Sequence, residues 1–173
     1  MKIVDHYLDW ATKSPSPNFS DRKNDIDLIV IHCISLPEGE YANSNIEDLF
    51  LNKIDCLKHD SFKSLEKLKV SSHLLVRRDG TVIQFVPFDK CAWHAGESSY
   101  DGRKNCNDFS IGIELEGCIG DIFTEQQYTE LSAILKELKS VYGIKNIVGH
   151  SDIAPGRKLD PGENFNWERV ADV

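Results

Sequence analysis

Short runs of apolar and β-branched residues, each bounded by turn-forming residues, alternate along the chain with stretches of helical spacing. These runs predict strands at residues 28–32, 72–76, 81–86, 110–116 and 144–148. In the run at 110–116, apolar residues alternate with polar or small ones, so Glu114 and Glu116 share one face of the predicted strand. Asp79-Gly80 separates two of the runs and is typical of a β-hairpin.

Apolar residues at helical spacing predict helices at residues 46–51, 61–68 and 124–142. The last of these begins at Thr124, three residues before Gln127, which is the arrangement of a capping box. The Pro- and Gly-rich segment 150–164 predicts a loop, and the Pro-punctuated residues 1–20 predict an irregular N-terminal lead-in. The mixed order of these elements predicts an α/β fold, with a single mixed β-sheet flanked by helices.

The length and net charge of the chain indicate the number of domains and exclude some classes of partner. A chain of 173 residues is expected to form one domain, 1–173, that buries about 70% of its unfolded surface. The formal net charge of −8 disfavours nucleic acid and anionic membranes as partners, because such a surface repels phosphates. The uncharged stretch 28–37 is far shorter than the ~20 apolar residues of a transmembrane helix.

The cysteines and the N-terminal segment indicate where the protein works. Its 5 cysteines are scattered and contain no CxxC pair, which is typical of reduced thiols rather than of a disulfide framework. The first twenty residues carry several charges and no apolar signal segment. We therefore expect a cytoplasmic protein.

Candidate catalytic side chains lie at predicted strand ends and in the last loop. His32 ends a strand, Glu114 lies within one, and the loop contains His150, Lys158 and Asp160. Two histidines and one carboxylate are the ligands of a catalytic zinc ion, which lowers the pKa of a bound water to about 7. A further carboxylate can act as the general base and a lysine can stabilise an oxyanion. Spacing alone is weak evidence here, and it leaves Asp152 as a rival ligand in the same loop.

Longer motifs carry a resemblance to a known family. They are Val-Ile-His-Cys-Ile-Ser-Leu-Pro around His32, Ala-Trp-His-Ala-Gly at 92–96, Asn-Asp-Phe-Ser-Ile-Gly-Ile-Glu-Leu-Glu-Gly at 107–117 and Gly-His-Ser-Asp-Ile-Ala-Pro-Gly-Arg-Lys-Leu-Asp-Pro-Gly at 149–162. Together they resemble the zinc-dependent type 2 N-acetylmuramoyl-L-alanine amidases, and among these the cytosolic enzymes of Gram-negative cell-wall recycling. The resemblance extends from about Ser14 to Trp167 and implies the fold of peptidoglycan-recognition proteins and type 2 amidases.

The resemblance implies a role for each matched residue. One zinc ion would be held by His32, His150 and Asp160, with Glu114 as general base and Lys158 as the oxyanion-stabilising cation. The bond cleaved would be the amide between the lactyl group of (1,6-anhydro)-N-acetylmuramic acid and L-Ala of the stem peptide. Residues expected to bind this anhydro-muropeptide are Trp93, Arg157 and Lys69. The domain 1–173 would then be a zinc amidase domain, and we expect a monomer.

The sequence departs from the family pattern at a few positions. Cys33 replaces an Asn that usually follows the first zinc histidine, Lys69 stands where an Arg is expected, and Asn105 stands where another basic residue is frequent. A lysine cannot form the bidentate contact that arginine makes with a carboxylate. The departures leave the predicted chemistry intact and affect the expected contacts with sugar and stem peptide.

Two other functions fit the same fold. A phage-type endolysin or autolysin would perform the same chemistry on intact peptidoglycan, but such enzymes commonly carry a wall-binding module or a basic surface. Related phage enzymes also often have Cys where Asp160 stands. A non-catalytic peptidoglycan-binding module would have lost its zinc ligands, whereas the full set and Glu114 are present here.

Overall fold

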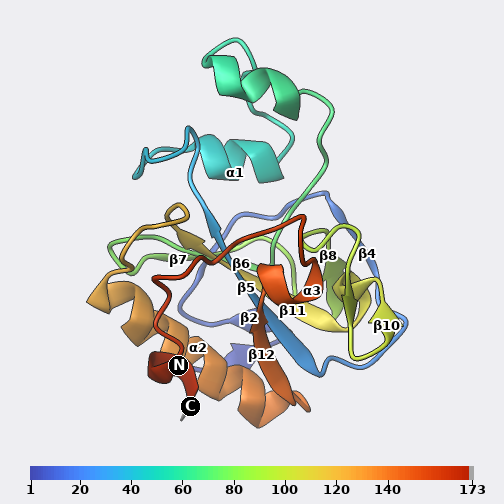
Figure 1. The fold of residues 1–173 in the computed structure, drawn as a ribbon. Helices are drawn as coiled ribbons and strands as arrows, with labels where there is room; N and C mark the ends of the chain where they lie inside the picture. Colours follow the sequence, from blue (N-terminus) through green and yellow to red (C-terminus); the bar gives the residue numbers. More distant parts are fainter. Residues whose placement is uncertain (172–173) are drawn as a thin grey trace.

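The computed structural model describes residues 1–171, which are built around a six-stranded mixed sheet (Figure 1). Across the sheet the strands are β12 (Asn146–Gly149), β5 (Leu28–Ile34), β11 (Ser110–Glu116), β6 (Leu74–Val76), β7 (Val82–Gln84) and β3 (Thr12–Lys13). The first four are parallel, β7 is antiparallel to β6, and β3 is parallel to β7. The predicted mixed sheet with flanking helices, and the hairpin within it, are therefore confirmed.

The two faces of the sheet are covered by different elements. Helix α2 (Glu125–Val141) lies along one face, where its apolar stripe packs against Ile29 and Ile31 of β5. Side chains alternate along a strand, so Leu28 and Val30 point to the other face, where they pack with Cys106 and Phe109. His32 is two residues after Val30 on the same strand, and Glu114 is its partner on β11, so both side chains also lie on the face away from α2. The capping box predicted at Thr124 is present.

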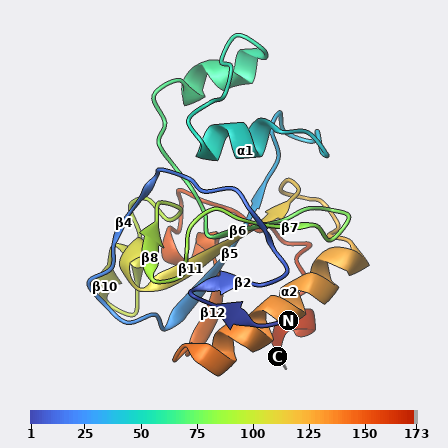
Figure 2. The same cartoon turned by 180° about the vertical axis from the view of Figure 1, so that it is seen from behind.

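The helices beyond α2 are short. α1 (Asn45–Phe50) and the 3₁₀ turn η1 (Asp60–Leu65) lie to one side of the sheet in both views (Figures 1 and 2). A second 3₁₀ turn, η2 (Cys106–Asp108), precedes β11, and α4 (Glu168–Ala171) packs on α2. Within residues 1–171, none of the helices has both the length and the apolar character needed to cross a bilayer.

The irregular lead-in expected at residues 1–20 is found only at 14–18, the part that contains the prolines, and short strands occupy much of the rest. β1 (Ile3–Val4) and β2 (Tyr7–Leu8) form a hairpin, and β4 (Phe19–Asp21) pairs with β8 (Lys90–Ala92) (Figure 2). The hairpin turn uses positive φ angles of 48° and 65° at Asp5 and His6. The side chain of Gln84 then accepts a hydrogen bond from Leu8 N at 2.8 Å. Strands of two or three residues are too short to show an apolar period, so the sequence pattern did not reveal them.

The loop expected at 150–164 also contains regular structure. α3 (His150–Ile153) follows β12 directly, and Asp152 accepts a hydrogen bond from Gly149 N at 2.7 Å at its start. A second unpredicted feature is the small hairpin of β9 (Ser99–Tyr100) and β10 (Arg103–Lys104). Both depend on local hydrogen bonds rather than on an apolar pattern.

Candidate active site

Strand register brings the predicted site residues together. In the parallel pairing of β5 with β11, His32 is the partner of Glu114. On the other side of β5, Gly149 of β12 pairs with Ile31, so His150 follows next to His32. Asp160 returns to the same place because its carbonyl accepts a hydrogen bond from Ser151 N at 3.0 Å.

The side chains of His32, His150 and Asp160 form a compact buried cluster. The Nδ1 atoms of His32 and His150 lie 2.9 Å apart, and Asp160 Oδ2 lies 3.0 Å from the first and 3.1 Å from the second. Their exposed fractions are 1%, 3% and 9%, respectively. Burial lowers the pKa of His32 to about 4, which keeps its imidazole neutral at physiological pH.

The chemistry of this cluster fits a zinc ion. Two imidazole nitrogens and a carboxylate oxygen are zinc ligands, and in a tetrahedral site with bonds of about 2.0–2.1 Å they would lie about 3.3 Å apart. The separations here, 2.9 to 3.1 Å, are close to that value. By contrast, the rival ligand Asp152 is exposed and caps α3. The three residues offer three ligand atoms, the number that a catalytic zinc ion typically takes from its protein.

Two glutamates on β11 have opposite environments. Glu114 is 8% exposed, and its Oε2 has no hydrogen-bond partner among the described residues. Burial and the charge of Asp160 raise the pKa of Glu114 well above its usual range, opposed by Lys158. Glu116 instead accepts hydrogen bonds from Arg77 Nη1 at 2.7 Å and from two backbone amides. Glu114 is therefore the carboxylate available for proton transfer, whereas Glu116 is held in a structural ion pair.

A cavity of about 380 Å³ adjoins the cluster. Lys158, Asp160 and Cys33 line it, together with residues of the segment that follows β11. Arg157 also reaches its wall, but its Nη2 donates hydrogen bonds to the carbonyls of Ala95 and Glu97 at 2.7 and 2.6 Å. Lys158 is thus a cationic side chain on the wall of this cavity, two residues before Asp160 in the sequence.

Residues 22–163 match the family described as N-acetylmuramoyl-L-alanine amidase (Amidase_2), and this range contains the whole cluster and Glu114. This chain belongs to that amidase family. It is 48% identical to the 1,6-anhydro-N-acetylmuramyl-L-alanine amidase AmpD of Escherichia coli K12, over 98% of this chain and 94% of the relative. Both the resemblance inferred from the motifs and the assignment as an amidase are confirmed.

Solved structures agree with the sequence comparison. A crystal structure of selenomethionine AmpD matches with a TM-score of 0.97 at 47% identity, covering 98% of this chain and 97% of that one. The E. coli amidase AmiD, in complex with the substrate anhydro-N-acetylmuramic acid-L-Ala-D-γ-Glu-L-Lys, matches with a TM-score of 0.62 at 34% identity. That match covers 85% of this chain and 56% of AmiD.

Of the residues predicted to bind substrate, Arg157 lines the cavity beside the cluster, whereas Trp93 and Lys69 are not among its lining residues. Trp93 is half-buried and follows β8, and its indole Nε1 lies 3.4 Å from Ser20 Oγ. Lys69 is exposed in the segment before β6. Asn105 has a φ of 59°, in the left-handed region that Asn adopts more readily than a long basic side chain. This backbone conformation is a physical reason for one departure from the family pattern, and the binding roles themselves stay predictions.

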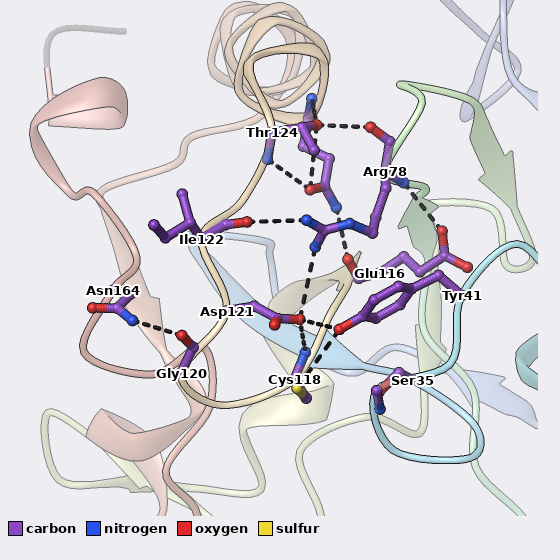
Figure 3. A network of polar contacts seen from close by, with 12 residues as sticks. Ser35, Tyr41, Arg78, Glu116, Cys118, Gly120, Asp121, Ile122, Thr124 and Asn164 are labelled. Carbon is purple, nitrogen blue, oxygen red and sulfur yellow. Dashed lines mark hydrogen bonds and ion pairs between the residues drawn. The ribbon is translucent and has the colours of Figure 1, made fainter.

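A polar network that the sequence did not indicate holds the segments around the amidase cavity (Figure 3). Asp121 Oδ2 accepts hydrogen bonds from Tyr41 Oη at 2.6 Å and from Cys118 N at 2.8 Å. The guanidinium of Arg78 stacks over the Tyr41 ring at 4.7 Å and lies 3.7 Å from the same carboxylate. The network joins the loop after β5, the hairpin of β6 and β7, and the segment after β11.

We predict that Asp121→Ala lowers the free energy of unfolding by about 1–3 kcal/mol, because it removes the acceptor of two part-buried donors. Hydrogen bonds from Tyr41 and Cys118 lower the pKa of Asp121 although burial opposes this. The stabilisation is therefore present above the unfolded pKa of about 3.9 and is lost as the pH falls through the folded value. Urea unfolding of wild type, Asp121→Ala and the single-bond control Tyr41→Phe, at pH 7 and pH 3, tests this. Equal stability of wild type and Asp121→Ala at pH 7 contradicts it.

Proposed function

We propose that this amidase hydrolyses the amide between the lactyl group of 1,6-anhydro-N-acetylmuramic acid and the L-Ala of the stem peptide. One zinc ion would be held by His32, His150 and Asp160. The observation that carries the proposal is the convergence of three ligand atoms next to the buried carboxylate of Glu114, whose Oε2 has no hydrogen-bond partner within residues 1–171. The names of the relatives support the substrate: AmpD is a 1,6-anhydro-N-acetylmuramyl-L-alanine amidase, and AmiD binds an anhydro-muropeptide.

Each side chain has a separate role in this reaction. When bound, zinc supplies Lewis-acid chemistry, which makes water more acidic and an amide carbonyl more electrophilic. Glu114 accepts a proton from the attacking water and returns it to the nitrogen of the leaving L-Ala. The ammonium of Lys158 stabilises the negative charge that develops on the carbonyl oxygen. The same carboxylate serves as base and then as acid, so it is unchanged after each turnover.

The proposed substrate is a small anhydro-muropeptide that has been released from the cell wall into the cytoplasm. We expect the enzyme to act on it as a monomer that binds neither nucleic acid nor membrane. The net charge of −8 supports this choice over a wall-bound polymer, because a lytic enzyme on an anionic wall gains from a basic surface. The muropeptide is itself anionic, so its binding would depend on local cations: Lys158, Arg157 and Lys69.

Mass spectrometry of the products tests the proposal. The purified protein would be incubated with anhydro-MurNAc-tripeptide or with intact peptidoglycan sacculi, each with and without a chelator. We expect free tripeptide from the small substrate, no release after chelation, and recovery when zinc is added back. Release from sacculi at a comparable rate would favour the lytic alternative, and a failure to cleave either substrate would contradict the proposed activity.

A further inference from the structure

A chain of buried polar contacts leads from His32 away from the ligand cluster. His32 Nε2 lies 2.9 Å from Nδ1 of His94, and Nε2 of His94 lies 3.1 Å from Oγ of Ser110. The Ser110 hydroxyl donates to the carbonyl oxygen of Cys106 at 2.6 Å. His94 is 9% exposed and Ser110 and Cys106 are fully buried, so water cannot substitute for these partners.

The last member of this chain fixes the direction of every hydrogen bond in it. A carbonyl oxygen can only accept, so the contact with Cys106 uses the single hydroxyl proton of Ser110. Ser110 Oγ therefore accepts from His94, which places the ring hydrogen of His94 on Nε2. Burial favours the neutral imidazole, so Nδ1 of His94 is bare and accepts from Nε2 of His32. His32 then has no hydrogen on Nδ1, the atom that faces the cluster. Nδ1 lies 3.0 Å from Asp160 Oδ2, so a bare nitrogen and a carboxylate oxygen face each other there, as two ligands of one cation would.

Ala95, the residue after His94, determines in a similar way which nitrogen of His150 carries the ring hydrogen. His150 Nε2 lies 3.1 Å from the carbonyl oxygen of Ala95, which can only accept a hydrogen bond, and 3.5 Å from Arg157 Nη2, which can only donate one. The contact with Ala95 is the shorter and places the ring hydrogen on Nε2, which leaves Nδ1 of His150 bare as well. The His94-Ala95 dipeptide is itself held by Asn107, whose Oδ1 accepts from both backbone amides at 3.0 and 2.7 Å.

Strand β11 makes room for this arrangement. A Cβ atom at Gly112 would lie 2.4 Å from Cγ of His94, closer than real contacts allow. The glycine in the middle of a fully buried strand therefore permits the His94 ring to lie against the backbone between Ser110 and His32. The Ala-Trp-His-Ala-Gly motif and Gly112 thus act together, because the glycine leaves the space that the histidine of the motif occupies.

We propose that His94 and Ser110 are positioning residues that hold His32 in its Nε2–H tautomer, with Nδ1 unprotonated and directed at the ligand cluster. Ala95 does the same for His150 through its carbonyl oxygen. The inference rests on the proposed zinc site, because it assigns to these residues the task of presenting two nitrogen lone pairs to a cation. Outer hydrogen bonds of this kind typically change metal affinity by about 10–100-fold.

Zinc affinity, measured by competition with a chromogenic chelator, tests the proposal with a matched pair of variants. His94→Leu removes the acceptor for His32, whereas His94→Asn places an amide oxygen near the former Nδ1 position. We expect His94→Leu to weaken zinc binding by about 10–100-fold and His94→Asn to lose much less. Ser110→Ala is expected to weaken binding too, because His94 can then adopt the other tautomer. Equal affinity in wild type and His94→Leu, or equal losses in Leu and Asn variants, would overturn the proposal.

A second readout does not depend on metal or on folding of a variant. Long-range ¹H–¹⁵N spectra of zinc-free wild type at pH 7 should show His32 protonated at Nε2. Protonation at Nδ1 would overturn the proposal. If wild type shows the expected tautomer but binds no zinc, the proposed function has failed and the positioning of His32 stands. A purely structural role for His94 would instead lower the stability of the zinc-free variants without separating their zinc affinities.

Discussion

Glu114→Gln is expected to lower kcat by about 10²–10⁴-fold while the protein keeps its full zinc content. The glutamine occupies the same volume but cannot accept a proton from water. The cluster of His32, His150 and Asp160 is unchanged by this substitution, so metal binding persists. Tripeptide release from the anhydro-muropeptide, together with zinc content by inductively coupled plasma mass spectrometry, provides both measurements on one preparation.

Glu116→Gln is the matched control for this variant. Glu116 lies two positions along the same strand, but it accepts hydrogen bonds from Arg77 and two backbone amides. Its substitution should reduce stability with a far smaller effect on kcat. If Glu114→Gln lost zinc as completely as a variant of Asp160, the assignment of base and ligand would be wrong.

The same substitution should stabilise the zinc-free protein at pH 7. The raised pKa of Glu114 means that the folded protein binds this proton at pH values where the unfolded chain has released it. Stability therefore falls as the pH rises from about 4.3 through the raised pKa, and Gln removes that dependence. Thermal unfolding of chelated wild type and Glu114→Gln between pH 4 and pH 8 measures the effect. A less stable Glu114→Gln at pH 7 would show that the carboxylate is better solvated than its burial indicates.

The parts of the fold that the sequence predicted are those with long, regular patterns. β5 and β11 each place seven residues in one strand, and α2 combines an apolar stripe with a capping box. Such elements bury enough apolar surface to determine their own structure. Strand alternation also placed Glu114 and Glu116 on one face, but it could not separate their roles, because the partners of Glu116 come from other segments.

The features that the sequence did not predict depend on contacts between distant segments. Asp121 is 80 residues from Tyr41, and neither residue has a local signal that identifies the other. The choice between Asp152 and Asp160 was likewise open from spacing, and only the family motif favoured the second. In the structure Asp152 is engaged as a helix cap, and the return of the chain through Ser151 brings Asp160 to the histidines. Strand register and the path of the loops decide which distant residues meet, and neither can be identified from a local pattern of residues.

Asp160→Ala is expected to weaken zinc binding by more than about 100-fold, beyond what outer hydrogen bonds contribute. The substitution removes one of three ligand atoms and the only anionic one, so two neutral imidazoles remain to hold a divalent cation. The backbone bond from Ser151 N to the carbonyl of residue 160 does not need the side chain, so the loop should keep its path. Chelator competition gives the affinity, and urea unfolding of the zinc-free form shows whether the fold is retained.

Asp152→Ala is the control that makes this result specific. It removes the same side chain from the same loop, eight residues earlier, but the carboxylate it removes caps α3 instead of facing the histidines. Loss of this hydrogen bond from the Gly149 amide costs about 0.5–1.5 kcal/mol of stability. Asp152→Ala should therefore be less stable than wild type and still bind zinc, whereas Asp160→Ala should fold and fail to bind it. Zinc loss in Asp152→Ala with retention in Asp160→Ala would reverse the assignment of the third ligand.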